Sequence, residues 1–295
     1  MKSSVKQDVL IERALRSLNE LPPFSPVLTT LMASLSSEDV SLPKLAAMIE
    51  KDIVLSGTML RIVNSALYGR GATVSSVCRA ITVMGLIKLR NTALGLSVNC
   101  IWKGVQTPAG WSMGRFNLHS LGTAILADQL AQRMPVSYPE DAFVSGLFHD
   151  LGKLVIATGL RPEHVQIARL LVLESDPLEC ERMVLGMTHA DISAAALERW
   201  NLPKQVRDAV AIHHAPDLGN PELYDGCKFH IGHVVHIADR IANGIGVSLK
   251  LSPALSDAEE LAEVEQVLNS VELSHLAPEL LHDFHSEFDA MRMAA

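Results

Sequence analysis

A histidine followed by an acid, His149-Asp150, interrupts the apolar run VSGLFHDLGKLVIA at residues 144–157. Imidazole nitrogens and carboxylate oxygens together form the mixed ligand set that iron, manganese, nickel, cobalt and zinc accept. Five further residues of these two types stand in other segments of the chain: His119, His189, His213, His214 and Asp239. Facing helices of a bundle can direct such side chains to one place, so the seven residues predict a centre for one or two divalent transition-metal ions.

Within this centre the residues divide between two ions. His119, His149, Asp150 and Asp239 are expected to hold the first ion, and the three remaining histidines the second, with the carboxylate of Asp150 as the bridge. Two divalent ions outweigh two carboxylates in charge, so the centre would attract phosphate and activate water, as a metal-dependent phosphohydrolase requires. Lys153 would then contact a phosphate oxygen and act as a catalytic residue.

Each of these residues also has a plainer interpretation. A single histidine on an apolar helix is commonly a hydrogen-bonded core residue. The pair His213-His214 can cap the C-terminal end of a helix, where cationic side chains are favoured. Asp239 beside Arg240 can form an ordinary ion pair, and Lys153 can extend its ammonium group into water. Taken one at a time, the residues leave the metal centre and these alternatives open.

The elements that must position these side chains are helices. Apolar residues recur at helical spacing along nearly the whole chain and alternating β-branched runs are scarce, which predicts an all-α protein. Helices are expected at about residues 7–21, 41–52, 52–69 and 77–98, the last broken at Gly85. Further helices are expected at 114–134, 139–150, 152–158, 162–174, 177–187, 189–200, 203–214 and 227–245. An acidic helix at about 256–273 and an amphipathic one around 280–291 follow. Gly104, Pro108 and Gly110 cluster at 103–113, where the periodicity lapses, and predict a junction.

The bulk composition excludes several classes of protein. The net charge of −8 and the lack of any basic run argue against a surface that binds nucleic acid. The apolar stretch at 92–102 is too short to cross a membrane. The four cysteines have no CxxC spacing, and the first residues do not resemble a signal peptide, so we expect a soluble, cytoplasmic protein.

Residues from about 20 to 247 resemble the HDOD domain, the HD-related output domain of bacterial signalling proteins. The N-terminal motifs that carry the resemblance are LPPFSPVLTTL, LAAMIEKDIVLSGTMLRIVNSALYG and VSSVCRAITVMGLIKLRNTALGLSV. Matches in the same order follow at GLFHDLGKLVI, THADISAAALERWNLPKQV, AIHHAP and HIADRIA. The resemblance implies a helical N-terminal subdomain at 1–102 packed on an HD-like helical bundle at 103–250, with a helical extension at 251–295.

The resemblance also extends to the HD and HD-GYP phosphohydrolases. Their metal ligands match onto the seven residues named above, and their lysine after the HD pair matches Lys153. Two features depart from the active relatives. The segment APDLGNPELYDG follows His214 where HD-GYP proteins carry a Gly-Tyr-Pro motif. Arg115 stands where some members use a glutamate ligand, so a third ion is not expected.

These features lead to two functional hypotheses. The favoured one is a non-catalytic output or scaffold domain that acts through contacts with signalling proteins, with any metal ion structural or sensory. The alternative is a metal-dependent phosphohydrolase, a phosphodiesterase of the HD superfamily. A helical scaffold without metal is a third possibility, because matching ligands do not by themselves establish turnover.

Overall fold

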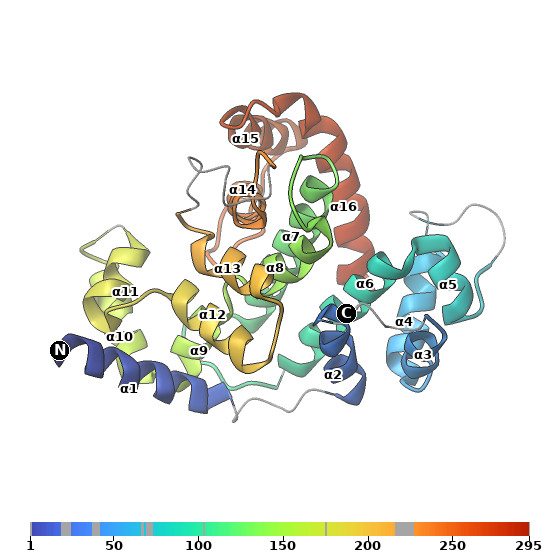
Figure 1. Ribbon diagram of the computed structural model, residues 1–295. Helices are drawn as coiled ribbons and strands as arrows, with labels where there is room; N and C mark the ends of the chain where they lie inside the picture. The colour runs from blue at the N-terminus through green and yellow to red at the C-terminus, as the bar shows by residue number, and fades with distance from the viewer. Residues whose placement is uncertain are drawn as a thin grey trace.

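The chain folds into helices packed on one another, as the computed structural model in Figure 1 shows. The structure describes residues 2–18, 25–36, 42–65, 68, 73–102, 104–174, 176–215 and 227–294. Within these ranges there is no β-strand, and one isolated parallel bridge joins Val136 to Phe229. The all-α prediction is confirmed.

Six α-helices are described in the first third of the chain, and three of them start after a capping residue. They are α1 (Lys2–Ser17), α2 (Pro26–Ala33), α3 (Leu42–Ile49), α4 (Ile53–Val63), α5 (Val77–Met84) and α6 (Leu86–Trp102). Asp52 accepts a hydrogen bond from Leu55 N at 3.0 Å before α4, and Ser76 accepts one from Arg79 N at 3.2 Å before α5. The ends expected at 21, 41 and 69 lie outside the described residues.

Helix α2 is missing from the sequence-based expectations. Its start has a clear signal, because Ser25 caps Leu28 N at 3.1 Å and Pro26 occupies the first helical position. Its buried residues Val27, Leu28, Leu31 and Met32 lie at i, i+1, i+4 and i+5, a helical pattern that spans only about two turns. A segment this short is fixed by the helices that it contacts, α3 and α6, more than by its own pattern.

The bundle that follows is formed by α7 (Met113–Ala131), α8 (Ala142–Phe148), α9 (Leu151–Gly159), α10 (Arg161–Leu170), α11 (Pro177–Leu185), α12 (His189–Arg199), α13 (Lys204–Ile212) and α14 (Ile231–Gly244). Helix α7 is buried on all sides from Ser120 to Ala131, between α8, α14 and α16. Only a helix in the middle of a core is buried in this way. Every face of α7 is therefore in contact with the protein interior.

The two ends of the chain pack on different parts of the fold. Helix α1 lies on α9 and α12, apart from α2–α6 (Figure 1). The C-terminal helices α15 (Asp257–Asn269) and α16 (Ala277–Ala294) cover the other side, where α16 contacts α7 as well as α4 and α6. Helix α16 thus joins the N-terminal helices to the bundle. The subdomain boundaries at 102 and 250 stay predictions.

A buried ion-pair cluster ties these parts together. The Lys88 ammonium of α6 lies 2.7 Å from Asp128 Oδ2 of α7 and 2.7 Å from Glu287 Oε1 of α16. Gln129 donates a further hydrogen bond to Glu287 at 3.1 Å. One lysine therefore faces two carboxylates from two other helices, and the cluster holds the three helices in register.

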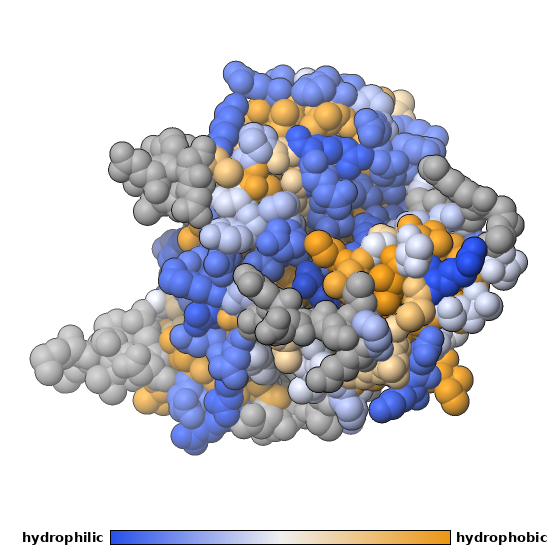
Figure 2. All heavy atoms as spheres, turned by 45° about the vertical axis from the view of Figure 1, so that its right-hand side comes forward, coloured by the Kyte–Doolittle hydropathy of each residue, from blue (hydrophilic) through white to orange (hydrophobic). Residues whose placement is uncertain are grey.

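Several apolar side chains remain exposed on the N-terminal helices. Ile53 and Val54 at the start of α4 are 85% and 74% exposed, and Val83 and Ile87 near the α5–α6 junction are 44% and 48% exposed. Figure 2 shows apolar atoms gathered on the face that it turns toward the viewer, beside a mostly hydrophilic region. Among the described residues no single helix is long and apolar enough to cross a membrane. One pair of helical segments, 139–159 and 161–170, is long and apolar enough when taken together, but it is bent by 110°.

Candidate metal centre

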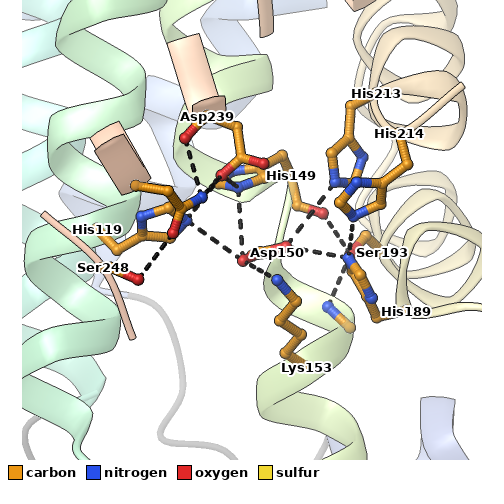
Figure 3. A network of polar contacts seen from close by, with 12 residues as sticks. His119, His149, Asp150, Lys153, His189, Ser193, His213, His214, Asp239 and Ser248 are labelled. Atoms are coloured by element: carbon orange, nitrogen blue, oxygen red, sulfur yellow. Dashed lines mark hydrogen bonds and ion pairs between the residues drawn. The ribbon is translucent and has the colours of Figure 1, made fainter. Parts of the chain in front are cut away.

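The seven predicted ligands come from five places in the bundle and meet at its centre (Figure 3). His119 lies in α7 and Asp239 in α14, while His189 is the first residue of α12. His213 and His214 directly follow α13. Helix α8 ends at Phe148 and α9 begins at Leu151, so the HD pair occupies the break between two helices. This break allows two adjacent side chains to point into the same space.

The break is held against the start of α12 by one serine. Ser193 Oγ donates to the carbonyl oxygen of His149 at 2.9 Å and accepts from Gly152 N at 2.7 Å. Gly152 makes this approach possible, because a Cβ atom on it would lie only 2.0 Å from the carbonyl oxygen of His189. The sequence Asp150-Leu151-Gly152 therefore places α9 and α12 close enough for Asp150 and His189 to share a site.

The ligands form two groups that Asp150 joins. In the first, His119 Nε2 lies 3.2 Å from Asp239 Oδ1, and His119 Nε2 and His149 Nε2 each lie 3.5 Å from Asp150 Oδ2. In the second, Asp150 Oδ1 lies 3.1 Å from His189 Nε2 and 3.8 Å from His213 Nε2. The two oxygens of one carboxylate thus face different groups, in line with the expected bridge.

The tautomers of the histidines follow from their outer partners. The Nδ1 atoms of His119, His149 and His213 each lie 2.7–2.8 Å from a backbone carbonyl oxygen, of Val247, Gly146 and Val210 respectively. A carbonyl oxygen can only accept, so each Nδ1 carries the hydrogen. The Nε2 lone pairs are left to point inward, which is the arrangement of imidazoles that bind metal ions.

The inward-facing atoms have no other partner within the described chain. His119 Nε2, His149 Nε2, His213 Nε2 and Asp150 Oδ1 are buried without a hydrogen bond, although each lies 3.1–3.8 Å from an acid or a histidine of the centre. Buried polar atoms of this kind are normally satisfied. Imidazole nitrogens and carboxylate oxygens that converge on one space suit a divalent cation, so these residues fit a metal ion.

The charges of the metal-free centre point the same way. Burial opposes a proton on His119, but Asp150 and Asp239 outweigh it and raise the pKa of His119 to about 9. Burial and the neighbouring His149 and His214 hold the pKa of His213 well below its usual value. Without a metal ion, a protonated His119 is therefore the cation between the two acids, and the second group offers a neutral imidazole at His213.

Lys153 and His214 mark the edge of the centre. The Lys153 ammonium lies 2.6 Å from Asp150 Oδ2, and its side chain is 27% exposed. His214 is half-buried, with Nε2 2.8 Å from His189 Nε2. Burial and the nearby His189 lower the pKa of His214 to about 3, so its imidazole is neutral. The residues after 215 that lead into the next segment, up to 226, lie outside the described part of the chain.

Several residues that support the centre were missed in the sequence. The buried Glu181 of α11 accepts from His189 Nδ1 at 2.8 Å and from the His189 backbone N–H at 2.7 Å. His236 Nδ1 lies 2.7 Å from the His213 carbonyl oxygen, and Asn243 Nδ2 donates to Asp239 Oδ1 at 2.8 Å. Arg115 does not point at the centre, because its Nε donates to the Leu249 carbonyl oxygen at 2.9 Å. Only the spacing of Asn243, one helical turn after Asp239, is a signal that sequence could have offered.

The comparison with known families agrees with this geometry. The HDOD domain model matches residues 21–216, which is more than half of the chain. The chain belongs to the HDOD family. An uncharacterized protein of Treponema pallidum (strain Nichols) is 25% identical to this HDOD protein over 204 residues, 67% of this chain and 38% of its own length.

Solved structures share the fold. A provisionally assigned signal transduction protein from Marinobacter aquaeolei VT8 is 21% identical with a TM-score of 0.70, over 100% of this chain and 66% of its own. A provisionally assigned phosphohydrolase from Shewanella amazonensis SB2B is 22% identical with a TM-score of 0.71, over 96% of this chain and 97% of its own. The chain spans 38% of the Treponema relative and 66% of the Marinobacter one, and these identities establish the fold alone.

Proposed function

We propose that this HDOD protein is a signal-transduction module that acts by binding other signalling proteins and holds one or two divalent transition-metal ions in its centre without catalytic turnover. The observation that carries this proposal is a complete set of inward-facing ligands in a closed interior. His119, His149, Asp150, His189 and His213 are each at most 1% exposed. A metal ion there would be structural or sensory.

Burial separates binding from turnover. A phosphate ester must contact the metal ion during hydrolysis, which needs an open coordination position and a path to it. In the described structure only Lys153 and His214 of the centre are appreciably exposed, and Lys153 is already paired with Asp150. The sequence after His214 also lacks the Gly-Tyr-Pro motif. These features support a protein that keeps the metal ligands but does not hydrolyse a phosphate ester.

The N-terminal helices support the partner-binding role. Ile53 and Val54 begin α4 in an almost fully exposed position, although apolar side chains are usually buried when they cluster. Helix α16 connects α4 to α7, the helix that carries His119. A partner that bound near α4 would thus contact elements that pack directly against the metal-bearing bundle.

A metal-dependent phosphohydrolase is the second candidate, and Lys153 is the observation that favours it. Its side chain is 27% exposed at the edge of the centre and could bind a phosphate oxygen. Two bound divalent ions would supply Lewis-acid activation of water and neutralise charge on the phosphate. Of the chain's own groups, Asp150 would hold its two oxygens toward the two ligand groups, and Lys153 would bind the phosphate.

Metal analysis followed by an activity assay tests both candidates. Protein purified without added metal is analysed for iron, manganese, nickel, cobalt and zinc, then assayed with a nitrophenyl phosphodiester in the presence of Fe²⁺ or Mn²⁺. We expect stoichiometric metal that is lost in His149→Ala and retained in the control His282→Ala, an exposed histidine of α16, with no turnover in any variant. Turnover that disappears in Asp150→Ala would establish the hydrolase instead, and a parent protein that binds no metal would refute the metal centre.

A further inference from the structure

The segment at the C-terminal end of α14 contacts His119 and Asp239, the two ligands of the first group that come from α7 and α14. We name residues 243–249, the last two residues of α14 and the five that follow them, the α14–α15 strap. We propose that this strap positions His119 and Asp239 and thereby sets the affinity of the first ligand group for its ion. The inference rests on the proposed metal centre and concerns residues that do not themselves touch the ion.

Two hydrogen bonds connect the strap to ligand side chains, and a third lies within the strap. The Val247 carbonyl oxygen accepts from His119 Nδ1 at 2.8 Å. Asn243 Nδ2 donates to Asp239 Oδ1 at 2.8 Å, the same oxygen that lies 3.2 Å from His119 Nε2. Ser248 Oγ donates to Asn243 Oδ1 at 2.8 Å, which fixes the orientation of the Asn243 amide. Figure 3 shows Ser248 beside His119 and Asp239. One short segment thus orients two ligands from two helices.

The other ligands are oriented in a different way. His149 and His213 donate to carbonyl oxygens three residues earlier in their own helices, so their orientation is local. His189 depends on the Glu181 carboxylate from α11. Among the described ligand histidines, His119 is the one whose Nδ1 donates to backbone more than 100 residues away, at a separation of 128. The orientation of His119 in the first group therefore depends on the strap, and that of the other three histidines does not.

The strap is itself held in place from two sides. Gly246 has a φ of +81°, a left-handed conformation that reverses the chain after α14. Gly122 of α7 lies directly beneath Val247, since a Cβ atom there would be 2.8 Å from Val247 Cγ1. Arg115 of α7 binds the Leu249 carbonyl oxygen at 2.9 Å. These contacts hold the strap against α7 and thereby fix the Val247 carbonyl oxygen within hydrogen-bond distance of His119.

This arrangement matches the outer partners that orient metal ligands in proteins generally. A carboxylate ligand that accepts a hydrogen bond from a fixed amide keeps its lone pair directed at the ion, and loss of such a partner typically weakens metal affinity by about 10- to 100-fold. Asn243→Ala removes the amide, while Ser248→Ala leaves the amide but frees its orientation. The expected losses are about 10-fold or more for Asn243→Ala and a smaller loss, by the same reasoning, for Ser248→Ala.

Titration with Co²⁺, followed by calorimetry and by visible absorption, provides the test. Ser270→Ala is the matched control, because its hydroxyl donates only to Val267 O within the end of α15. The melting temperature of each metal-free variant reports folding separately. We expect both strap variants to bind Co²⁺ more weakly than Ser270→Ala and to gain less melting temperature from the ion, with near-parental melting temperatures when metal-free.

The outcomes separate this inference from the proposed function. If the parent binds Co²⁺ and both strap variants bind it as tightly as Ser270→Ala does, the strap does not position the ligands, and the metal centre stands. If the variants lose only metal-free melting temperature, the strap has a merely structural role and the inference fails in the same way. A parent that binds no Co²⁺ overturns the metal centre and the inference together. Ser248→Ala alone decides the question if Asn243→Ala does not fold.

Discussion

Gly152, two residues after the HD pair, fixes the distance between α9 and α12. A Cβ atom at this position would lie 2.0 Å from the His189 carbonyl oxygen and 2.8 Å from the carbonyl carbon of the same residue. Real Cβ contacts essentially never fall below 3.0 Å. In Gly152→Ala the two helices must therefore separate by about 1 Å at the point where His189 enters the centre. Backbone atoms are involved on both sides, so no side chain can yield instead.

The expected cost follows from this overlap. Overpacking of a core by one methyl group typically destabilises a protein by about 1–3 kcal/mol. The hydrogen bonds that join Ser193 of α12 to His149 and Gly152 would lengthen as well. Alanine offers up to about 1 kcal/mol of helix propensity in return. We expect Gly152→Ala to lower the free energy of unfolding by about 1–3 kcal/mol and to weaken metal binding through His189.

Gly57 of α4 provides the matched control. A Cβ atom added to this helical glycine would meet no other atom within 4 Å. Gly57→Ala should therefore leave stability unchanged or raise it by up to about 1 kcal/mol, because only helix propensity changes. Urea denaturation of both variants and the parent measures the difference. A Gly152→Ala variant that is as stable as Gly57→Ala and retains the parental metal content would show that the close approach of α9 to α12 is not required.

Three further predictions concern charged groups. Burial raises the pKa of Asp141 from 3.8 to about 6, so the folded protein loses about 2–3 kcal/mol of stability as the pH rises from 3.8 to about 6. Asp141→Asn should therefore be more stable than the parent at pH 8 and little changed at pH 4. An equal difference in stability at both pH values would contradict this. Lys88→Met leaves Asp128 and Glu287 facing each other without a cation and should lower the free energy of unfolding by about 3–5 kcal/mol at pH 7, measured by urea denaturation. The loss should be smaller in acid, because burial raises the pKa of Glu287 and this carboxylate then takes up a proton. An unchanged stability would show that Lys88 is dispensable. Because the pKa of His119 is about 9, its imidazole is protonated at pH 7 to 8, and Co²⁺ must displace this proton to bind. The apparent affinity for Co²⁺ should therefore fall about tenfold from pH 8 to pH 7. An affinity that does not change with pH would refute the assigned protonation.

The helices could be predicted from the sequence because each long segment carries its own periodic apolar face. The pattern at 114–134 predicts a helix over residues that α7 in fact contains. It could not show that α7 is enclosed by α8, α14 and α16, since that depends on the whole fold. Helix α2 was missed because its pattern is too short to distinguish from a loop.

The candidate centre divides in the same way. Histidine and aspartate side chains are visible in a sequence, and the family resemblance matches the same seven residues to known metal ligands. The partners that orient them are largely invisible there. The Val247 carbonyl oxygen that accepts the hydrogen bond from His119 is backbone, which every residue possesses. Glu181 lies in a different helix from His189, and nothing in its local sequence distinguishes it from a solvated glutamate. Tertiary contacts alone reveal both roles.

The two oxygens of Asp150 have a thermodynamic consequence. Because one carboxylate faces both ligand groups, its orientation cannot be set for one ion without being set for the other. The first ion to bind would fix the Asp150 rotamer and draw Oδ2 away from Lys153, 2.6 Å distant, or hold Oδ1 toward His189. The ordering required for the second ion would then already be complete. Two ions that shared this carboxylate would be linked reciprocally, so that binding of either one would change the affinity for the other.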